Sequence, residues 1–310
     1  MVSDFSPVQK EIISGLTAGT ITTVSTHPLD LVKVRLQLLA TNKKPQGYYD
    51  VVKRIVKDSK QHSFFRETYR GLGVNLLGNS IAWGLYFGLY RASKDWVFQW
   101  CNTDVKRSND TTNNDKEMTS LMYLLAAAMS GVATSVLTNP IWVIKTRIMS
   151  TSFVDSRSYR STVDGIKKLY RIEGLAGFWR GLVPSLFGVS QGAIYFTVYD
   201  TLKYHYFAAK HVDKKKKLSN LEYITITSLS KMVSVTAVYP LQLLKSNLQS
   251  FEVSTVINPR TSHRVWKLIT TIYVRDGVTG LYKGLLANLI RAVPSTCITF
   301  CVYENFRHWL

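Results

Sequence analysis

A short motif that begins with proline occurs three times in this chain at nearly equal spacing. The first copy is Pro28-Leu-Asp-Leu-Val-Lys-Val-Arg35, and similar segments begin at Pro140 and Pro240. A second motif, made of an aromatic residue, a basic residue and a glycine, follows each proline after 41 to 44 residues. Its glycines are Gly71, Gly181 and Gly284. Two motifs that repeat three times in register indicate three copies of one module, each about 100 residues long.

Long segments without a charged side chain lie beside these motifs. Residues 71–90, 118–144 and 181–199 contain no Asp, Glu, Lys or Arg. An α-helix of about 18 or more apolar residues is long enough to span a membrane. The mean hydropathy of the whole chain is nevertheless near zero, as in soluble proteins. Helices with one polar face along a water-filled path would account for both observations, so we predict an all-α membrane protein.

Each module is expected to contribute two membrane-spanning helices, the first of which contains the proline. A proline inside a helix removes a backbone hydrogen bond, so Pro28, Pro140 and Pro240 predict kinks. Amphipathic patterns over residues 47–65 and 159–173 predict surface helices between the two spans of a module. Residues 41–70 carry eight Lys or Arg and three acids, which favours the negative side of a membrane. The spans are expected at residues 8–39, 72–96, 118–149, 182–206, 218–249 and 285–309.

Six spans would place both termini on the same side of the membrane. Three similar pairs of helices predict a pseudo-threefold bundle around a central path. Small residues four apart, Gly15 with Gly19 and Ala127 with Gly131, are expected to let a neighbouring helix approach closely. The three modules are residues 1–101, 102–211 and 212–310.

The formal net charge of +19 restricts the kinds of partner. The positive charge is spread over all connecting segments and helix ends, which argues against a nucleic-acid-binding protein with one basic patch. It fits an anionic substrate and an anionic lipid. Cys101, Cys297 and Cys301 and six scattered histidines show no disulfide or metal-site spacing, and no Walker A segment is present. We therefore expect neither an enzyme nor a metal site.

Two positively charged residues of the third copy stand where the other copies have glycine. They and their counterparts are Lys231 (Gly19 and Gly131) and Arg291 (Gly78 and Gly188). An ionisable side chain inside a membrane span is costly, so both are candidates for a functional site. The alternative is a side chain that reaches to the membrane surface. A departure from threefold symmetry favours the first interpretation, because an asymmetric ligand would require it.

The proline motif followed by the second motif resembles the mitochondrial carrier family over essentially the whole chain. Residues 79–88, 139–149, 183–192 and 231–249 are most similar to the family's FAD and folate branch. The resemblance implies transport of FAD across the mitochondrial inner membrane by alternating access, with FAD as the transported molecule and no cofactor. NAD, pyrimidine nucleotides and folate are alternative substrates, and a channel, an uncoupler or a non-transporting scaffold is an alternative function. The implied assembly is a monomer in contact with lipid, cardiolipin above all.

The resemblance also implies two gates of ion pairs that open in alternation. In the matrix-side gate, Asp30 is expected to pair with Lys145. Aromatic or amide side chains replace the other two acids, which leaves two lysines without acidic partners. Two glutamines match the family's bracing glutamines, and Met149 stands at the third bracing position. Trp142 and Gln242 replace the two acids, and Lys245 and Lys33 are the lysines that face them. The bracing glutamines are Gln37 and Gln249.

The cytosolic gate is implied by Tyr-acid-x-x-base segments near the other ends of the helices. Two ion pairs are expected, Asp200 with Arg307 and Glu304 with Lys94. The third pair is incomplete, since Arg91 stands where the first copy would need an acid. The remaining members of this gate are Lys203, Tyr90, Tyr199 and Tyr303.

The substrate positions that the family implies lie between the two gates. The planar guanidinium of Arg291 can bind phosphate oxygens through two parallel hydrogen bonds, and Lys231 adds positive potential. Glycines at the equivalent positions are expected to leave room for a bulky dinucleotide. The complete expected set is Arg291, Lys231, Gly78, Asn79, Phe187, Gly188 and Gln191.

Overall fold

The computed structural model describes residues 7–38, 47–60, 63–101, 118–153, 155, 158–210, 219–251 and 264–309. All regular structure within these ranges is helical, which confirms the predicted all-α class. The elements are α1 (Pro7–Leu38), α2 (Tyr48–Ser59), α3 (Phe64–Thr68), α4 (Leu72–Cys101), α6 (Ser120–Ser150), α7 (Thr162–Glu173), the 3-10 helix η2 (Leu175–Trp179), α8 (Leu182–Gly188), α9 (Ser190–Lys210), α10 (Asn220–Gln249), α12 (Arg264–Gly280) and α13 (Leu285–Trp309).

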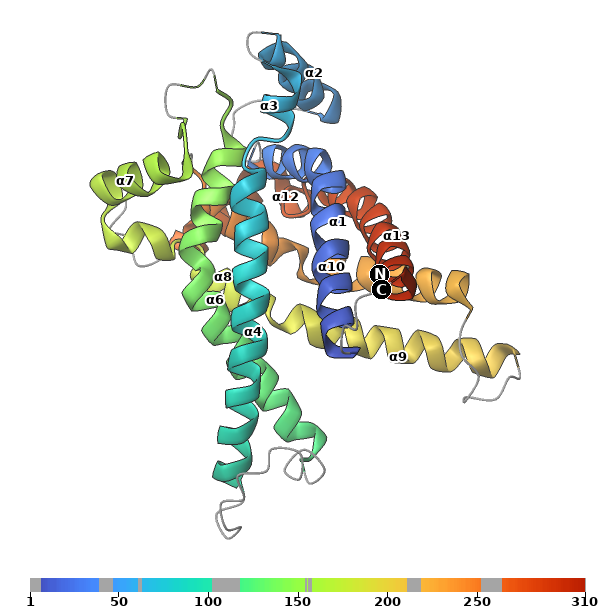
Figure 1. Ribbon diagram of the computed structural model, residues 1–310. Coiled ribbons are helices and arrows are strands. Elements are labelled where there is room, and N and C mark those ends of the chain that lie inside the picture. Colours follow the sequence, from blue (N-terminus) through green and yellow to red (C-terminus); the bar gives the residue numbers. More distant parts are fainter. Residues whose placement is uncertain are drawn as a thin grey trace.

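The long helices pack as three pairs, and each pair joins two different copies of the module. The pairs are α4 with α6, α8 and α9 with α10, and α13 with α1. The last pair joins the third copy to the first, so the three modules close into a ring. Figure 1 shows the α4–α6 pair running side by side and diverging from α9 at the lower end. The surface helices α2 and α7 lie at the opposite, upper end.

Within the described ranges, four helical stretches are long and apolar enough to cross a membrane. They are Ser120–Ser150, Leu175–Ala209, Leu221–Gln249 and Leu285–Tyr303. The helices α1 and α4 are of similar length, 32 and 30 residues, and are missing from this set. In α1 the run Thr17 to Thr26 contains many hydroxyl side chains, which lower its hydropathy. We expect these polar side chains of α1 to face a water-filled path.

The fourth span differs from the expectation of one continuous helix over residues 182–206. The helix breaks at Val189, between α8 and α9. The Val189 side chain packs on α6, because a Cβ atom added at Gly131 would lie 2.8 Å from Val189 Cγ1. A third surface helix, α12, also occurs, although the sequence patterns did not single it out.

The two sequence motifs of each copy are joined by a hydrogen bond. The residue before each proline donates to the backbone carbonyl of the basic residue in the second motif. The bonds are His27 Nε2 to Arg70 O (3.0 Å), Asn139 Nδ2 to Arg180 O (3.1 Å) and Tyr239 Oη to Lys283 O (2.8 Å). Three different side chains make the same contact, which explains why the two motifs keep their spacing. The helices themselves continue through Pro28, Pro140 and Pro240.

The glycine of each second motif has a left-handed backbone conformation. The φ angles of Gly71, Gly181 and Gly284 are 81°, 71° and 83°. Each glycine lies against the C-terminal end of a proline-containing helix from the next copy. A Cβ atom at Gly181 would lie 2.9 Å from Gln249 Cγ and 3.1 Å from the carbonyl oxygen of Lys245. Only glycine satisfies both the backbone angle and this close approach.

We expect Gly181→Ala to destabilise the protein more than Gly71→Ala. Both substitutions place a side chain at positive φ, which costs about 1–3 kcal/mol. Only the alanine at 181 would also meet a backbone oxygen, whereas the one at 71 meets the flexible Met149 side chain at 3.1 Å. Thermal unfolding of the detergent-purified variants checks this order. Gly73→Ala is the control, because Gly73 is helical with nothing within 4 Å, and equal midpoints for all three would contradict the prediction.

Only one of the two predicted close-packing pairs is in contact with a neighbour. Gly131 lies against Val189, as described above. Atoms added at Gly15 and Gly19 would meet nothing within 4 Å, so that part of the prediction is wrong. The reason is that α1 packs against α13 through larger polar groups, among them Thr22 Oγ1 and Thr299 Oγ1 at 2.9 Å.

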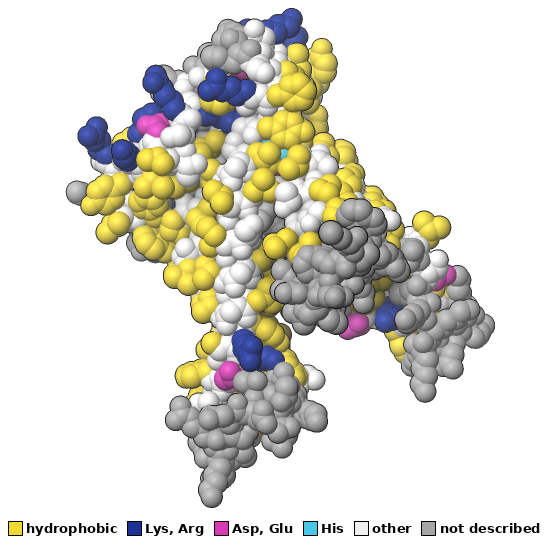
Figure 2. Space-filling view, in the orientation of Figure 1, with side chains coloured by type: hydrophobic (Ala, Val, Ile, Leu, Met, Phe, Trp, Pro, Cys, Tyr) yellow, Lys and Arg dark blue, Asp and Glu magenta, His cyan; other side chains and the backbone are white. Residues whose placement is uncertain are grey.

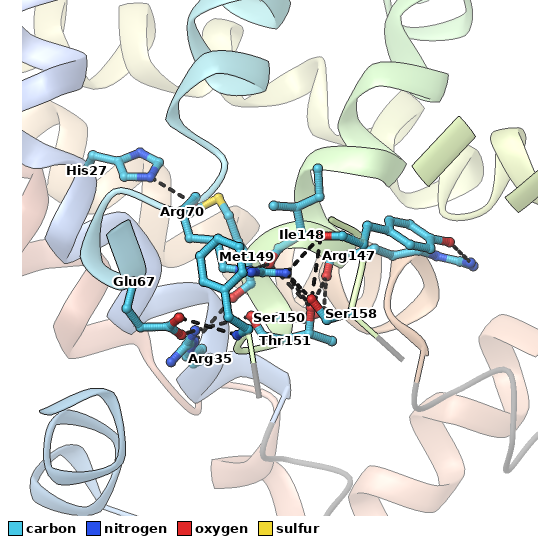
Figure 3. A network of polar contacts seen from close by, with 12 residues as sticks. His27, Arg35, Glu67, Arg70, Arg147, Ile148, Met149, Ser150, Thr151 and Ser158 are labelled. Carbon is cyan, nitrogen blue, oxygen red and sulfur yellow. Dashed lines mark hydrogen bonds and ion pairs between the residues drawn. The ribbon is translucent and has the colours of Figure 1, made fainter. Parts of the chain in front are cut away.

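Buried arginines join the first and second copies at the end where the helices converge (Figure 3). Arg35 Nε donates to the carbonyl oxygen of Met149 at 3.3 Å, and Arg70 Nε donates to the carbonyl oxygen of Ile148 at 2.7 Å. Within the first copy, Arg35 Nη2 also lies 2.6 Å from Glu67 Oε1. Burial lowers the pKa of Arg70 to about 10, so it stays charged at neutral pH. Arg147 makes two hydrogen bonds of 2.9 Å to Glu173 in the second copy. These contacts hold the proline-containing helices together at one end of the bundle.

Candidate functional site

Five positively charged side chains from four helices gather in the centre of the bundle. Each lies within electrostatic reach of at least one other member, and we call them the central basic cluster. Among the described side chains, the acid that interacts with this cluster is Asp30. The members are Lys33 on α1, Lys145 on α6, Lys231 and Lys245 on α10, and Arg291 on α13. An excess of positive charge in one cluster attracts an anion and lowers its cost of leaving water.

Asp30 is paired with Arg291 in this conformation. Asp30 Oδ1 lies 3.0 Å from Arg291 Nε, and both side chains are partly exposed. The two groups form an ion pair without the alignment of a hydrogen bond, since Arg291 Nε has no hydrogen-bond partner. This pair connects the predicted matrix-side gate to the predicted substrate position.

The expected pair of Asp30 with Lys145 is not among the ion pairs of the described side chains. The Lys145 ammonium lies instead over the Trp142 ring, 5.1 Å from its centroid. The physical reason is that α13 packs on α1 and thereby places the long Arg291 side chain beside Asp30. A pairing of Asp30 with Lys145 in another conformation stays a prediction.

Trp142 fills the space that Gly78 leaves. A Cβ atom at Gly78 would lie 3.4 Å from the Trp142 ring and 3.0 Å from Ile141 Cγ2. Gly78 is buried, so its small size here accommodates the neighbouring helix α6 and provides no room for a ligand. Gly188 is different, because nothing lies within 4 Å of the position its Cβ would take. The two glycines therefore have different surroundings in this conformation, and a role of either one in substrate binding stays a prediction.

Gln242 connects the predicted gate to two other helices. Its Nε2 donates to Gln191 Oε1 on α9 at 2.9 Å, and its Oε1 accepts from Asn288 Nδ2 on α13 at 3.2 Å. Asn288 is buried, and the sequence patterns did not point to it. Its position four residues after Gly284, on the helix that carries Arg291, was the available signal.

Hydrogen bonds of the two glutamines hold the converging helix ends. Gln37 donates to Tyr239 Oη at 3.2 Å and accepts from Ser246 Oγ at 2.8 Å. Gln249 accepts from Thr146 Oγ1 at 3.0 Å. Each of these bonds joins two different copies, so the converging end is closed by neutral groups as well as by buried ion pairs.

Two further predicted substrate residues lie on different helices, Phe187 at the end of α8 and Asn79 on α4. Phe187 is 62% exposed, so its ring is available for contact. Asn79 on α4 is partly buried, and its Nδ2 donates to Asn75 Oδ1 at 3.4 Å. The structure thus places Phe187 and Gly188 at the end of α8, where the N–H of Val189 donates to the carbonyl oxygen of Leu186 at 3.2 Å.

The residues of the predicted cytosolic gate lie toward the diverging helix ends. Lys94 and Lys203 each lie over a tyrosine four residues earlier, Tyr90 at 5.7 Å and Tyr199 at 5.8 Å. Asp200 is exposed and Tyr303 is partly buried. The side chains of Glu304 and Arg307 lie outside the described part of the chain, so both predicted pairs stay predictions.

Charge and hydrophobicity are separated along the bundle. Figure 2 shows that most of the visible Lys and Arg side chains gather at the upper end, around α2 and α7. Hydrophobic side chains cover the middle of the α4–α6 pair. Trp83 and Phe87 on α4 and Leu137 on α6 are exposed. An apolar band between a basic end and a polar end is the pattern of a protein that spans a membrane.

A ring of paired membrane-spanning helices that converge at one end around a basic cluster defines a membrane transport protein. The chain belongs to the mitochondrial carrier protein family, whose model matches residues 4–99, 116–210 and 216–310. The resemblance deduced from the two motifs is therefore confirmed.

Several characterised members of this family are similar to the chain over most of its length. It is 54% identical to the mitochondrial FAD carrier protein of Saccharomyces cerevisiae, across 99% of this chain and 98% of that protein. It is 31% identical to mitochondrial nicotinamide adenine dinucleotide transporter 1 of the same yeast, across 98% and 78%. It is 30% identical to the chloroplastic folate transporter 1 of Arabidopsis thaliana, across 94% and 92%.

Proposed function

We propose that this protein carries FAD across the mitochondrial inner membrane by alternating access. The observation that carries the proposal is the 54% identity to the yeast mitochondrial FAD carrier over nearly the full length of both chains. The central basic cluster supports it, because FAD brings a pyrophosphate into a site that has five cations and one acid. The pyrophosphate oxygens suit the planar fork of Arg291.

Binding of FAD would compete with Asp30 for the guanidinium of Arg291. In the conformation described here the two side chains are 3.0 Å apart and partly exposed. Such a pair is worth only about 0.2–1 kcal/mol, so a doubly charged pyrophosphate can displace the single carboxylate. Asp30 is then free to pair with Lys145 on α6. The exchange of partners would link the arrival of the substrate to the state of the matrix-side gate.

The remaining features of the proposal concern cofactor, lipid and assembly. FAD is the transported molecule, and no prosthetic group is required. The protein acts as a monomer surrounded by lipid, with cardiolipin at the basic end. The proposed chemistry is transport without catalysis, because the similar proteins are named as carriers and transporters. NAD is the second candidate substrate, because the yeast NAD transporter is also similar over most of this chain.

Reconstitution into liposomes tests the proposal directly. Liposomes that contain the protein are given labelled FAD, FMN, NAD, folate and CTP in parallel. We expect saturable uptake of FAD that exceeds uptake of the other four and is absent from protein-free liposomes. Uptake of NAD or folate without FAD would overturn the proposed substrate. Proton or ion leak in the absence of any substrate would instead support a channel or uncoupler.

A further inference from the structure

A lysine and a tyrosine that meet on facing helices both depart from the threefold pattern of the chain. The Lys231 ammonium on α10 lies over the Tyr195 ring on α9, 5.8 Å from its centroid. Because the helix pairs join neighbouring copies, the equivalent contacts elsewhere would involve Gly19 with Ile298 and Gly131 with Leu85. Neither equivalent has a cation or an aromatic ring. The α9–α10 pair therefore has a cation beside an aromatic ring, although the other two helix pairs pack without either group at these positions.

Tyr195 is the first member of a row of aromatic rings across three helices. It stacks with Tyr199 on the same helix, with ring centroids 6.3 Å apart and planes inclined by 24°. Tyr199 meets Tyr223 of α10 edge to face at 6.5 Å. Tyr223 in turn lies 5.3 Å from Phe300 of α13. A row of rings offers a stacking surface, because flat aromatic groups add to such a row in offset or edge-to-face contact.

Lys231 lies at the Tyr195 end of this row of rings, where it is accessible and interacts electrostatically with the central basic cluster. The Lys231 side chain is exposed although it lies in the interior of a membrane-spanning helix. It is within electrostatic reach of Arg291, the residue that holds Asp30. A phosphate bound between these two cations would thus bring whatever is attached to it next to Tyr195.

We propose that Tyr195 is a substrate-binding residue on which a flat ring of the dinucleotide stacks while its phosphate binds Lys231 and Arg291. This inference rests on the proposed function and adds the residue that recognises the ring. Without substrate, the Lys231 ammonium covers the ring of Tyr195. The phosphate draws the ammonium away, and the substrate ring takes its place. Tyr195 thereby favours phosphates that carry an aromatic ring over phosphates that do not.

The alternative is a structural contact that holds α9 against α10. A structural role predicts that loss of the ring lowers the unfolding temperature and leaves the affinity for substrate unchanged. Stacking of a base on an aromatic side chain predicts the reverse, with an affinity change of about 10-fold. The two roles are separated by measuring KM, kcat and thermal unfolding on the same variants.

The experiment measures FAD uptake by the full-length protein in liposomes. Tyr195→Leu, which copies Leu85 of the first module, is expected to raise KM for FAD about 10-fold with a smaller change in kcat. Tyr195→Phe and Tyr195→Trp keep a ring and are expected to retain a KM close to that of the unmodified protein. Tyr204→Leu is the matched control, an exposed tyrosine nine residues later on the same helix. If Tyr195→Leu does not fold, Tyr195→Ile, which copies Ile298, replaces it.

A double variant adds a second criterion. If the ring and the cation hold one ligand, Tyr195→Leu combined with Lys231→Ala loses less affinity than the two single losses together. An unchanged KM for FAD in both Tyr195→Leu and Tyr195→Ile would overturn this inference alone. Absence of FAD uptake by the unmodified protein would overturn the proposed function and this inference with it.

Discussion

Replacement of Arg291 by alanine is expected to reduce FAD uptake by about 10- to 100-fold while the protein still folds. A hydrogen bond to a charged group contributes about 1.5–3 kcal/mol, which corresponds to that range of affinity. The substitution removes the guanidinium that is available to the substrate phosphate, and it also releases Asp30 from its partner in the conformation described here. The first consequence weakens binding of the substrate, and the second leaves Asp30 free to pair with Lys145 when no substrate is bound. Uptake into liposomes and thermal unfolding in detergent are measured on the same preparation.

Two comparison variants make the Arg291 result specific. Arg291→Lys keeps the charge and loses the planar fork, so it is expected to retain more uptake than Arg291→Ala. Arg54→Ala removes one charge from an exposed position on the surface helix α2 and is expected to leave uptake unchanged. Unchanged uptake in Arg291→Ala would remove this residue from the site. Equal losses in Arg291→Ala and Arg54→Ala would indicate an effect of net charge.

The exchanged pair Asp30→Lys with Lys145→Asp is expected to retain more FAD uptake than either single variant. Each single substitution puts two like charges at the meeting point of α1 and α6 and should reduce uptake by at least about 10-fold. The double variant restores opposite charges in the reverse order. The expectation holds even though Asp30 is paired with Arg291 in this structure, because we propose that it pairs with Lys145 when the substrate binds Arg291.

A second exchange distinguishes the two partners of Asp30. Asp30→Arg with Arg291→Asp also restores opposite charges, yet it removes the cation that the substrate needs and adds an acid beside it. We expect no recovery in that double variant. Equal loss in all three Asp30 and Lys145 variants would count against their pairing during transport. Recovery in the Arg291 exchange would show that Arg291 serves the gate and does not contact the substrate.

Much of the fold followed from periodicity and composition. The helix that contains Arg291 begins and ends at the predicted residues, 285 and 309. Its bounds were accessible because a glycine with a special backbone angle precedes it, at Gly284. The break at Val189 was not accessible, since nothing in the local pattern of residues 182–206 distinguishes a continuous helix from one that another helix interrupts. The packing of Val189 on Gly131 decided that point.

The candidate site was predictable in its members and less so in its contacts. Lys231 and Arg291 stood out because they break the threefold pattern, and the structure brings both into one cluster with Lys33, Lys145 and Lys245. The residue that pairs with Asp30 could not be predicted from the sequence, because every helix in the ring has neighbours from two copies. The contact of Gly78 with Trp142 was not predictable for the same reason, since it joins α4 of the first copy to α6 of the second.

The amino-acid sequence by itself determined that this protein is a triplicated, all-helical membrane protein with two unmatched cations in its third copy. These properties are carried by residue order, by the spacing of two motifs and by the length of uncharged runs, all of which are local. Only the tertiary structure decided which side chains meet, including Asp30 with Arg291 and Tyr195 with Lys231. Those contacts cross between copies of the module, and a repeating sequence states what each copy contains without stating which neighbour it will face.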